Sequence, residues 1–571
     1  KTMRNTHGET MSDSFVVGPT DLPLLDKTIG HALDEAASLW RDSEALVVPH
    51  QGVRWSWGQL AAKVDTLAMA LLRLGFEKGD RLGIWATNLS EWTLTQLAAA
   101  KIGVILVNIN PAYRPGELDY VLNKVGCAGL VTGVRFKSSD YIEMLNGLLP
   151  ELKTCEPGRL AAKRAPALHT IIRLGDETTP GMFSFDEVLG LGSDCDRSDL
   201  VRVAASLESH DAINIQFTSG TTGAPKGATL SHYNILYNSR FIGRILRSTT
   251  RDRICVPVPL YHCFGMVGGT MVALTCGATV VYPAEAFEPE LVLRTIENER
   301  CTALYGVPTM FAAMLEHEEF ASRDVSSLRT GIMAGAPCPV ELMKQTVSRF
   351  HMPEITIAYG MTETSPVSFQ SDVEDPVQKR VGTVGRIHPH ARAKIVDQDG
   401  HIVARGVQGE ILTSGYLVMQ GYWDDAAKTA EAIDSDGWMH TGDLGTLDED
   451  GWLRITGRVK DMVIRGGENI YPREIEEYLY QHPKIVEAQV FGVPDDKYGE
   501  ELAVWIRLRD GELATEEEIR DFCSGKIAHY KIPRYIRFVD EFPMTVTGKI
   551  QKFEMRRIMR ELLDLQEQET A

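Results

Sequence analysis

Short hydrophobic runs alternate with amphipathic stretches along most of the chain. Residues 80–87 (DRLGIWAT) and 104–109 (VILVNI) are typical of strands, and 90–103 (SEWTLTQLAAAKIG) of the helix between them. Further strands are predicted at 254–260, 278–283, 302–308, 327–337 and 354–360, with helices at 289–300, up to about 318 and from 339. Strands that alternate with helices indicate an α/β fold with a mainly parallel, helix-covered sheet.

The pattern changes near residue 381. The segments VGTVGR (381–386), ARAKIVD (391–397), GEILTSG (409–415) and GWLRITG (451–457) are short and are separated by Gly and Asp turns. They predict a small antiparallel barrel or sheet. A second alternating unit follows Arg458, with a helix from Pro472, strands near 485–492 and 502–508, and a helix from about 515.

These changes predict the domain organisation of a chain too long for one compact domain. We expect an N-terminal domain over 21–457, a β-rich subdomain within it at about 381–457, a boundary at 458–461 and a small α+β domain over 462–571. Residues 1–20 show no pattern of their own, and we expect them to be poorly ordered.

Residues 254–284 contain no Asp, Glu, Lys or Arg. An uncharged run of this length can indicate a membrane span, but Pro257, Pro259 and several glycines interrupt it. We therefore interpret it as a buried strand, helix and strand. No transmembrane segment is predicted.

Charge and cysteine content limit the partners and the compartment. The formal net charge is -19, which disfavours nucleic acid as a partner. The nine cysteines are dispersed and form no CxxC pair, so reduced thiols are expected. The first twenty residues lack the features of a signal or transit peptide, which favours the cytoplasm over the mitochondrial matrix. The sequence leaves the oligomeric state open, including a homodimer.

The segment FTSGTTGAPKGATLSH (217–232) is the most informative part of the sequence. Ser, Thr and Gly crowd between an apolar strand and a helix, so backbone amides and hydroxyls can surround a phosphate while Lys226 supplies charge. The usual Gly-Lys-Ser/Thr nucleotide loop is absent, because Pro225 precedes Lys226 and Gly227 follows it.

Two later segments also end predicted strands. MAGAP (333–337) has small residues against which a flat base could lie, and YGMTE (359–363) combines three chemistries. Tyr359 offers a stacking face, Thr362 a hydroxyl for a phosphate and Glu363 an oxygen ligand for Mg²⁺. Each motif alone is also compatible with an ordinary turn.

Together these segments resemble the adenylate-forming superfamily, which includes acyl-CoA synthetases, luciferases and the adenylation domains of peptide synthetases. The resemblance continues through HTGD (440–443), GRVKDMVIRGGENIYPREIE (457–476) and PMTVTGKIQK (543–552), in the order of the family. It implies ATP, Mg²⁺ and coenzyme A as cofactors, and a carboxylic acid that is activated as an acyl-adenylate before transfer to the CoA thiol.

The resemblance also implies roles for individual residues. It implies a catalytic role for Lys549, Lys226, Thr362 and Glu363, with Glu363 as metal ligand, and a hinge at Lys460 about which a mobile C-terminal domain rotates. The ATP- and AMP-binding residues implied are Thr218, Ser219, Gly220, Thr221, Thr222, Gly223, Lys226, Gly335, Ala336, Pro337, Tyr359, Gly360, Met361, Thr362, Asp443, Arg458 and Lys549. Those implied for CoA are Gly466 and Gly467, with Glu468, Lys497 and Lys531 as further candidates.

Segments outside the shared motifs, such as PLYHCFG (259–265) and HYKIPRYI (529–536), are similar to the medium-chain fatty acyl-CoA ligases of the acyl-CoA synthetase family member 2 group. We therefore expect a medium-chain fatty acid as substrate. The candidates for an acyl pocket are His262, Phe264, Gly265, Val307, Met310 and Met333, which could equally be core residues. Alternatives are an acyl-AMP ligase that loads a carrier protein, a CoA ligase for short, aryl or sulfur-containing acids, a luciferase-like oxygenase and an inactive ligand-binding homologue.

Overall fold

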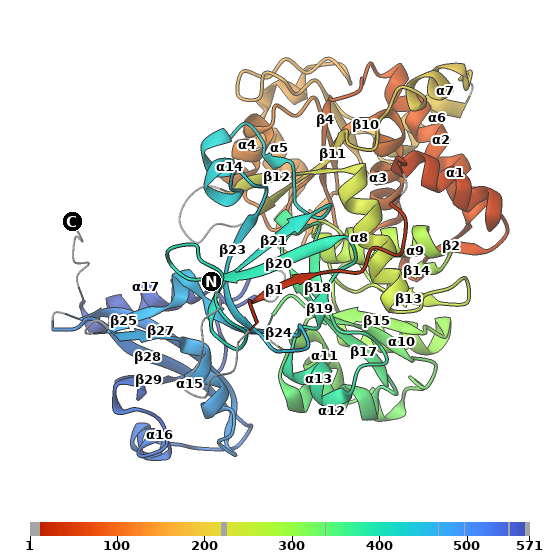
Figure 1. Ribbon diagram of the computed structural model, residues 1–571. Coiled ribbons are helices and arrows are strands. Elements are labelled where there is room, and N and C mark those ends of the chain that lie inside the picture. Colours follow the sequence, from red (N-terminus) through yellow and green to blue (C-terminus); the bar gives the residue numbers. More distant parts are fainter. Residues whose placement is uncertain are drawn as a thin grey trace. The chain divides into compact units, whose positions relative to one another are not determined.

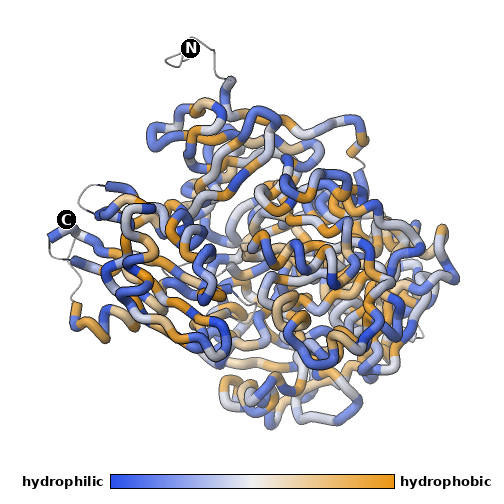
Figure 2. The backbone as a smooth tube through the Cα atoms, turned by 90° about the horizontal axis from the view of Figure 1, so that it is seen from below, coloured by the Kyte–Doolittle hydropathy of each residue, from blue (hydrophilic) through white to orange (hydrophobic). Residues whose placement is uncertain are grey.

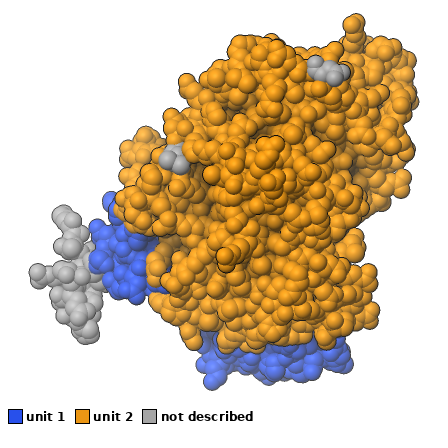
Figure 3. All heavy atoms as spheres, turned by 90° about the vertical axis from the view of Figure 1, so that its right-hand side faces the viewer, with its two compact units in different colours: residues 1–16, 393–412, 440–571 blue, residues 17–392, 413–439 orange. Residues whose placement is uncertain are grey.

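The computed structural model describes residues 12–24, 26–193, 195–218, 225–336, 338–465, 468–495, 497–545 and 549–565. The chain forms two compact units, which Figure 3 shows in different colours. We call Val17–Arg392 with Thr413–Met439 the large unit. The small unit contains the residues up to Val16, Ala393–Leu412 and the chain from His440 onward.

An eight-stranded sheet forms one half of the large unit. Its core strands are parallel, and their short hydrophobic runs are buried on both faces, as in ILVN at 105–108. Only β12 and β22 at one edge run antiparallel to their neighbours. The strand order is β10 (Phe183–Ser184), β9 (Thr170–Arg173), β6 (Gly129–Thr132), β4 (Arg81–Trp85), β5 (Ile105–Asn108), β11 (Ala212–Thr218), β12 (Lys226–Ser231) and β22 (Gly421–Tyr422).

A nine-stranded sheet forms the other half, also parallel at its centre and antiparallel at both ends. The strand order is β19 (Arg386–Ile387), β18 (Val367–Gln370), β17 (Glu354–Gly360), β16 (Thr330–Ala334), β15 (Ala303–Gly306), β13 (Arg253–Cys255), β14 (Thr279–Val281), β2 (Glu44–Val48) and β3 (Val53–Ser56). A small hairpin, β7 (Arg135–Phe136) with β8 (Ser139–Asp140), stands apart from both sheets.

Helices cover the two sheets, and in Figure 1 α10 to α13 lie beside β15 and β17. Ser56 and Gln59 form a capping box that starts α2, and Ser231 with Asn234 starts α8 in the same way. Helix α3 is buried almost all round because other helices pack against it. The helices are α1 (Ile29–Leu39), α2 (Trp57–Arg73), α3 (Ser90–Ile102), α4 (Pro115–Lys124), α5 (Tyr141–Leu148), α6 (Phe185–Ser193), α7 (Ser198–Ala204), α8 (His232–Ile245), α9 (Val272–Cys276), α10 (Pro289–Glu299), α11 (Pro308–Glu316), α12 (Val340–Arg349), α13 (Val377–Gly382) and α14 (Ala426–Ala432).

The uncharged stretch 254–284 is a buried part of this unit, as the sequence predicts. It contains β13, a π-helical segment at Phe264–Met271, α9 and β14. The first strand is shorter than predicted and ends at Cys255, because Pro257 and Pro259 cannot donate to a strand ladder. Among the described residues, no helix is both long and apolar enough to cross a membrane.

Two short segments differ from their predictions. Only the last residue of VGTVGR, Arg386, belongs to a strand, the short β19. Helix α13 runs through Gly382 instead, and the buried Arg380 guanidinium donates to the carbonyls of Asp375 and Ile355. Within the N-terminal segment that was expected to be poorly ordered, Phe15–Val17 form β1. Ser14 holds this strand, since its N–H donates to Val403 O and its carbonyl accepts from Ile395 N.

The small unit contains most of a five-stranded sheet in the order β1 (Phe15–Val17), β20 (Ala391–Val396), β21 (Gly409–Gly415), β23 (Met439–Leu447) and β24 (Leu453–Arg458). The chain passes between the two units within four of these strands. Because the small unit resumes at His440, it includes part of the predicted β-rich subdomain. The boundary at 458–461 stays a prediction.

A second sheet of the small unit has the order β26 (Glu468–Ile470), β25 (Val463–Arg465), β28 (Gly499–Leu508) and β27 (Ile485–Asp495), with β29 (Tyr535–Phe538) beside β28. Hydrophobic and hydrophilic segments alternate along the chain (Figure 2). Within β27, Val490 and Phe491 belong to different hydrophobic clusters because successive side chains point to opposite faces. The helices α15 (Pro472–Leu479), α16 (Glu516–Cys523) and α17 (Lys552–Leu563) complete the unit.

Candidate functional site

The predicted phosphate loop is framed by two paired strands. Thr218 ends β11 and lies opposite Lys226, which begins β12. The antiparallel pairing therefore fixes both ends of the loop. Its central residues, Ser219, Gly220, Thr221, Thr222 and Gly223, lie outside the described part of the chain.

Glu363 is the centre of a buried polar group at this point. Its side chain is only 5% exposed, and its Oε1 accepts hydrogen bonds from Tyr422 OH at 2.8 Å and Thr218 Oγ1 at 3.3 Å. Burial and the adjacent carboxylate of Glu363 raise the pKa of Tyr422, which keeps this hydroxyl a donor. The Lys226 ammonium lies 4.4 Å from the centre of the Tyr422 ring.

Three segments far apart in sequence thus meet at Glu363: the end of β11, the turn after β17, and β22. Tyr422 is a residue that the motifs did not identify. It reaches the site because β22 pairs with β12, in the register Ala228 opposite Tyr422.

The YGMTE segment begins at the end of β17, where the backbone of Gly360 packs closely against Pro366. A Cβ on Gly360 would lie 1.8 Å from the carbonyl oxygen of Pro366, so a glycine is required there. The Tyr359 ring is tilted against Phe369, and Met361 N–H donates to Pro366 O. Thr362 begins the short helical turn Thr362–Thr364 and is 8% exposed.

The MAGAP segment leaves the neighbouring strand β16. Ala334 pairs with Ala358 of β17, so both motifs follow the carboxyl ends of adjacent parallel strands, where ligands commonly bind in α/β sheets. Gly335 has a φ of +88° and is exposed, and Ala336 is half-buried. Pro337 lies outside the described residues.

The candidates for the acyl pocket come from three elements of one hydrophobic cluster. Val307, Met310 and Met333 are buried members of it, and Phe264 packs against it. The Phe264 ring stacks on Tyr305, a residue outside the predicted set, with ring centres 6.0 Å apart. His262 and Gly265 lie near Phe264 in the chain. Gly265 packs so closely against Pro259 that a Cβ on Gly265 would lie 2.4 Å from the carbonyl oxygen of Pro259.

In the small unit, the structure joins Asp443 and Arg458. They are opposite each other in β23 and β24, and Arg458 Nε donates to Asp443 Oδ1 at 2.8 Å. Asp443 is 7% exposed, while the Arg458 side chain is 60% exposed. Glu410 accepts from Gly442 N at 3.1 Å and so holds the turn before Asp443.

Lys460 lies in a single turn of 3-10 helix, Val459–Asp461, and is exposed. Lys549 is exposed in a loop whose backbone is closed by Thr545. Thr545 N–H donates to Lys549 O at 2.7 Å, and Lys549 N–H donates to Thr545 Oγ1 at 3.0 Å. These bonds fix the backbone of Lys549.

The candidate CoA-binding residues contact different partners and do not form one cluster among the described residues. Lys531 Nζ lies 2.7 Å from both carboxylate oxygens of Glu474, and the Lys497 ammonium lies over the ring of Tyr498. Glu468 is exposed at the start of β26. Gly466 and Gly467 lie outside the described residues.

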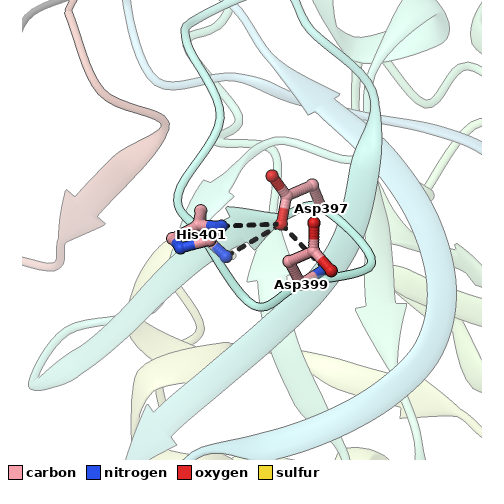
Figure 4. A group of neighbouring side chains, drawn as sticks. All are labelled: Asp397, Asp399 and His401. Carbon is pink, nitrogen blue, oxygen red and sulfur yellow. Dashed lines mark hydrogen bonds and ion pairs between the residues drawn. The ribbon is translucent and has the colours of Figure 1, made fainter.

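Asp397, Asp399 and His401 bring their ligand atoms together at the surface (Figure 4). All three are exposed, and Asp397 Oδ1 accepts from the N–H groups of Asp399 and His401. The same Asp-x-Asp-Gly turn recurs at Asp434 and Asp448, each with its first aspartate capping the backbone. This cluster is therefore a repeated turn, and we assign no metal to it.

Comparison with known proteins gives two family matches. The family described as AMP-binding enzyme matches residues 33–423, and the AMP-binding enzyme C-terminal domain matches residues 474–549.

Individual relatives cover nearly the whole chain. YngI of Bacillus subtilis (strain 168), named as a candidate acyl-CoA synthetase, is 47% identical over 95% of this chain and 99% of its own length. The Rattus norvegicus mitochondrial medium-chain acyl-CoA ligase ACSF2 is 47% identical over 97% of this chain and 91% of its own. The crystal structure of the anthranilate CoA ligase AuaEII in complex with anthranoyl-AMP has a TM-score of 0.82 and 27% identity, and the match covers 95% of this chain and 99% of that one.

Proposed function

This chain belongs to the AMP-binding enzyme family and is an acyl-CoA synthetase, and we propose that its acid substrate is a medium-chain fatty acid. An acyl-CoA synthetase is an acid–thiol ligase that uses ATP, Mg²⁺ and coenzyme A. The observation that carries the proposal is the 47% identity to a rat medium-chain acyl-CoA ligase over 97% of this chain. The hydrophobic cluster that contains Val307 and Met310, with Phe264 packed against it, supports the proposal, because aliphatic, aromatic and thioether groups suit a hydrocarbon tail.

We propose that the large unit binds the triphosphate through the loop between Thr218 and Lys226. Lys226 would neutralise charge on the β- and γ-phosphates. Thr362 would direct its hydroxyl to the α-phosphate, and the segments around Gly335 and Tyr359 would hold the adenine. The positions of these segments after adjacent parallel strands support this assignment.

Glu363 fits the requirements of a Mg²⁺ ligand. Both of its hydrogen bonds reach Oε1 and come from neutral hydroxyls, and no ion pair occupies the carboxylate in the described part of the chain. A buried carboxylate of this kind offers a hard oxygen to a divalent cation. When bound, Mg²⁺ would supply positive charge beside the phosphates.

The first half-reaction forms the acyl-adenylate. The carboxylate of the acid attacks the α-phosphorus of ATP, a mixed anhydride with AMP forms, and pyrophosphate leaves. We propose that Lys549 bridges the attacking carboxylate and the α-phosphate, since two anions must approach each other there. Asp443 and Arg458 would hold the ribose, the carboxylate by accepting from its hydroxyls.

The second half-reaction forms the thioester. The CoA thiol attacks the acyl carbon and AMP leaves with the electrons of the broken anhydride bond. We propose that a rotation about Lys460 exchanges Lys549 for the residues that receive CoA. Gly466, Gly467 and Glu468 are the proposed CoA-facing segment, with Lys497 and Lys531 as candidate phosphate contacts.

We also propose a cytoplasmic location. All nine cysteines are free, which is typical of a reducing compartment. Fractionation of the source cells tests this, because recovery of the protein with mitochondria would match the rat relative instead.

The substrate is tested with a panel of acids from acetate to palmitate, including anthranilate and benzoate. Acyl-CoA formation is measured by mass spectrometry at matched acid concentrations, and kcat/KM is compared. We expect a maximum at medium chain lengths. A maximum at an aryl or short acid would overturn the substrate while keeping the reaction.

A further inference from the structure

Three amide side chains form a buried ladder across two strands of the eight-stranded sheet. Gln216 and Asn214 lie on β11, and Asn108 is the register partner of Gln216 on β5. Gln216 Nε2 donates to Asn214 Oδ1 at 2.8 Å, and Asn214 Nδ2 donates to Asn108 Oδ1 at 2.9 Å. Each of the three residues is at most 3% exposed.

Both ends of this ladder reach the irregular segment between β13 and the π-helical turn. At one end Gln216 Oε1 accepts from Cys263 Sγ, 2.9 Å away. At the other, Asn108 Nδ2 donates to Tyr261 O at 2.9 Å and lies 3.6 Å from Met266 Sδ.

A fourth amide holds the start of the same segment. Asn88 donates to Val258 O at 3.0 Å and accepts from Leu260 N at 2.9 Å. The prolines at 257 and 259 exclude this stretch from the strand ladder, so side-chain amides satisfy its backbone instead. This stretch carries His262, Phe264 and Gly265, the candidates for the acyl side of the site.

The ladder also touches the phosphate side of the site. The Thr362 side chain lies beside the Cys263 thiol, and burial raises the pKa of Cys263 to about 12. Because the thiol is protonated and donates to Gln216, its sulfur is left to accept from the Thr362 hydroxyl. Thr362 therefore lies against the end of the ladder, and its hydroxyl proton can turn from the sulfur to a phosphate.

Buried amides are costly unless they are fully paired, and an apolar side chain could fill the same space. A fully paired network, in contrast, holds its members in one geometry. Here that geometry joins the segment that faces the acyl chain to the turn that carries Thr362.

We propose that the ladder of Cys263, Gln216, Asn214 and Asn108 positions Thr362 relative to the acyl-side segment, so that both the rate of adenylation and the preferred acid length depend on it. These are positioning residues, which act through Thr362 and the segment 258–266. This inference rests on the proposed function and deepens it.

The test uses purified full-length protein and ATP–pyrophosphate exchange with the acid panel. Gln216→Leu removes an amide of the ladder at nearly constant volume, and Cys263→Ala removes the thiol. We expect kcat for exchange to fall by about 10- to 100-fold, since small displacements of reacting groups have effects of this size. We also expect the ratio of medium-chain to short-chain kcat/KM to fall, with the KM for ATP nearly unchanged.

The chain offers matched controls for both substitutions. Gln96 is 4% exposed, and neither its Oε1 nor its Nε2 has a hydrogen-bond partner among the described residues. Cys127 is fully buried in a different hydrophobic cluster. Gln96→Leu and Cys127→Ala should leave the rate and the chain-length ratio at the wild-type value.

Cys263→Ser separates positioning from packing, because it restores a donor to Gln216. We expect it to recover part of the rate lost in Cys263→Ala. If Gln216→Leu fails to fold, the comparison of Cys263→Ala with Cys263→Ser decides alone. The proposal is overturned if the chain-length ratio stays at the wild-type value, if the controls show the same loss, or if serine behaves like alanine.

Failure of the proposed function is distinguishable from failure of this inference. A wild-type preference for another acid would overturn the medium-chain assignment. The ratio of variant to wild type, measured on whichever acids the wild type prefers, would still test the ladder.

Discussion

The surroundings of Glu363 and of Lys549 show two ways of holding a charged side chain. Glu363 is 5% exposed, and hydroxyls from two other segments of the large unit bind its carboxylate. Lys549 is exposed, and the hydrogen bonds around it fix its backbone through Thr545. In the proposed reaction Glu363 stays in place as a Mg²⁺ ligand, whereas Lys549 must approach the phosphate for adenylation and withdraw before CoA reacts. Rigid packing suits the former and an exposed loop the latter.

The largest effect is expected for Lys549→Ala. Adenylation should fall by about 100- to 1,000-fold, because one preorganised positive charge is lost where two anions meet. Transfer from preformed acyl-AMP to CoA should be retained. ATP–pyrophosphate exchange and single-turnover thioester formation measure the two steps.

The matched control for this variant is Lys526→Ala, another exposed lysine of the small unit. It should leave both half-reactions unchanged. Equal loss of both steps in Lys549→Ala would contradict the role of Lys549.

Glu363→Gln should have the next largest effect. The amide oxygen can still accept from Thr218 and Tyr422, but the charge that favours a divalent cation is gone. We expect adenylation to fall by about 100-fold and the Mg²⁺ concentration at half-maximal rate to rise. Tyr422→Phe removes only one hydrogen bond and should cost about tenfold. A Mg²⁺ titration in Glu363→Gln that superimposes on that of the wild type would rule out Glu363 as the ligand.

Lys460→Pro tests whether Lys549, unlike Glu363, must move during the reaction. Proline restricts the backbone at the proposed hinge, so adenylation should be spared while acyl-CoA formation slows by about tenfold. The two rates are compared in one preparation. An unchanged overall rate would move the hinge elsewhere.

The change with the smallest expected effect on the reaction rate is a pH dependence of the stability of the large unit. Burial lowers the pKa of His232 to about 4 and that of His388 to about 3, from an ordinary value of 6.5. Below this ordinary value the unfolded chain binds protons that the native unit does not. Stability is therefore full above pH 6.5 and is lost as pH falls, by about 1.4 kcal/mol per pH unit for each histidine.

Hydrogen exchange measured by mass spectrometry at about pH 7 and about pH 5 can separate the two units. Peptides of the large unit should lose protection against global opening after correction for intrinsic exchange. His232→Gln should flatten this slope even if it lowers stability at neutral pH. A slope that the variant leaves intact would show that other groups titrate.

Local pattern was enough to predict most of the fold. The alternation of hydrophobic runs and amphipathic segments predicted β4, α3 and β5 with nearly their observed bounds. It failed at residues 381–385, where the sequence pattern predicts a strand that the structure does not form. There the buried Arg380 holds a short helix instead, through tertiary contacts that no local pattern contains.

Motifs predicted some residues of the candidate site, and tertiary contacts bring in the others. The resemblance of the motifs predicted the family, which the comparisons confirm, and pointed to Lys226 and Glu363. Tyr422 and Cys263 were missed because strand pairing, not a motif, brings Tyr422 to Glu363, and a side-chain ladder holds Cys263. The roles of individual residues stay predictions until the variants are measured.

The most direct measurement is the set of products formed from octanoate, ATP, Mg²⁺ and CoA by the wild-type protein. We predict octanoyl-CoA, AMP and pyrophosphate in equal amounts, with octanoyl-AMP accumulating only when CoA is omitted. Formation of ADP and phosphate, or accumulation of octanoyl-AMP in the presence of CoA without any thioester, would contradict it.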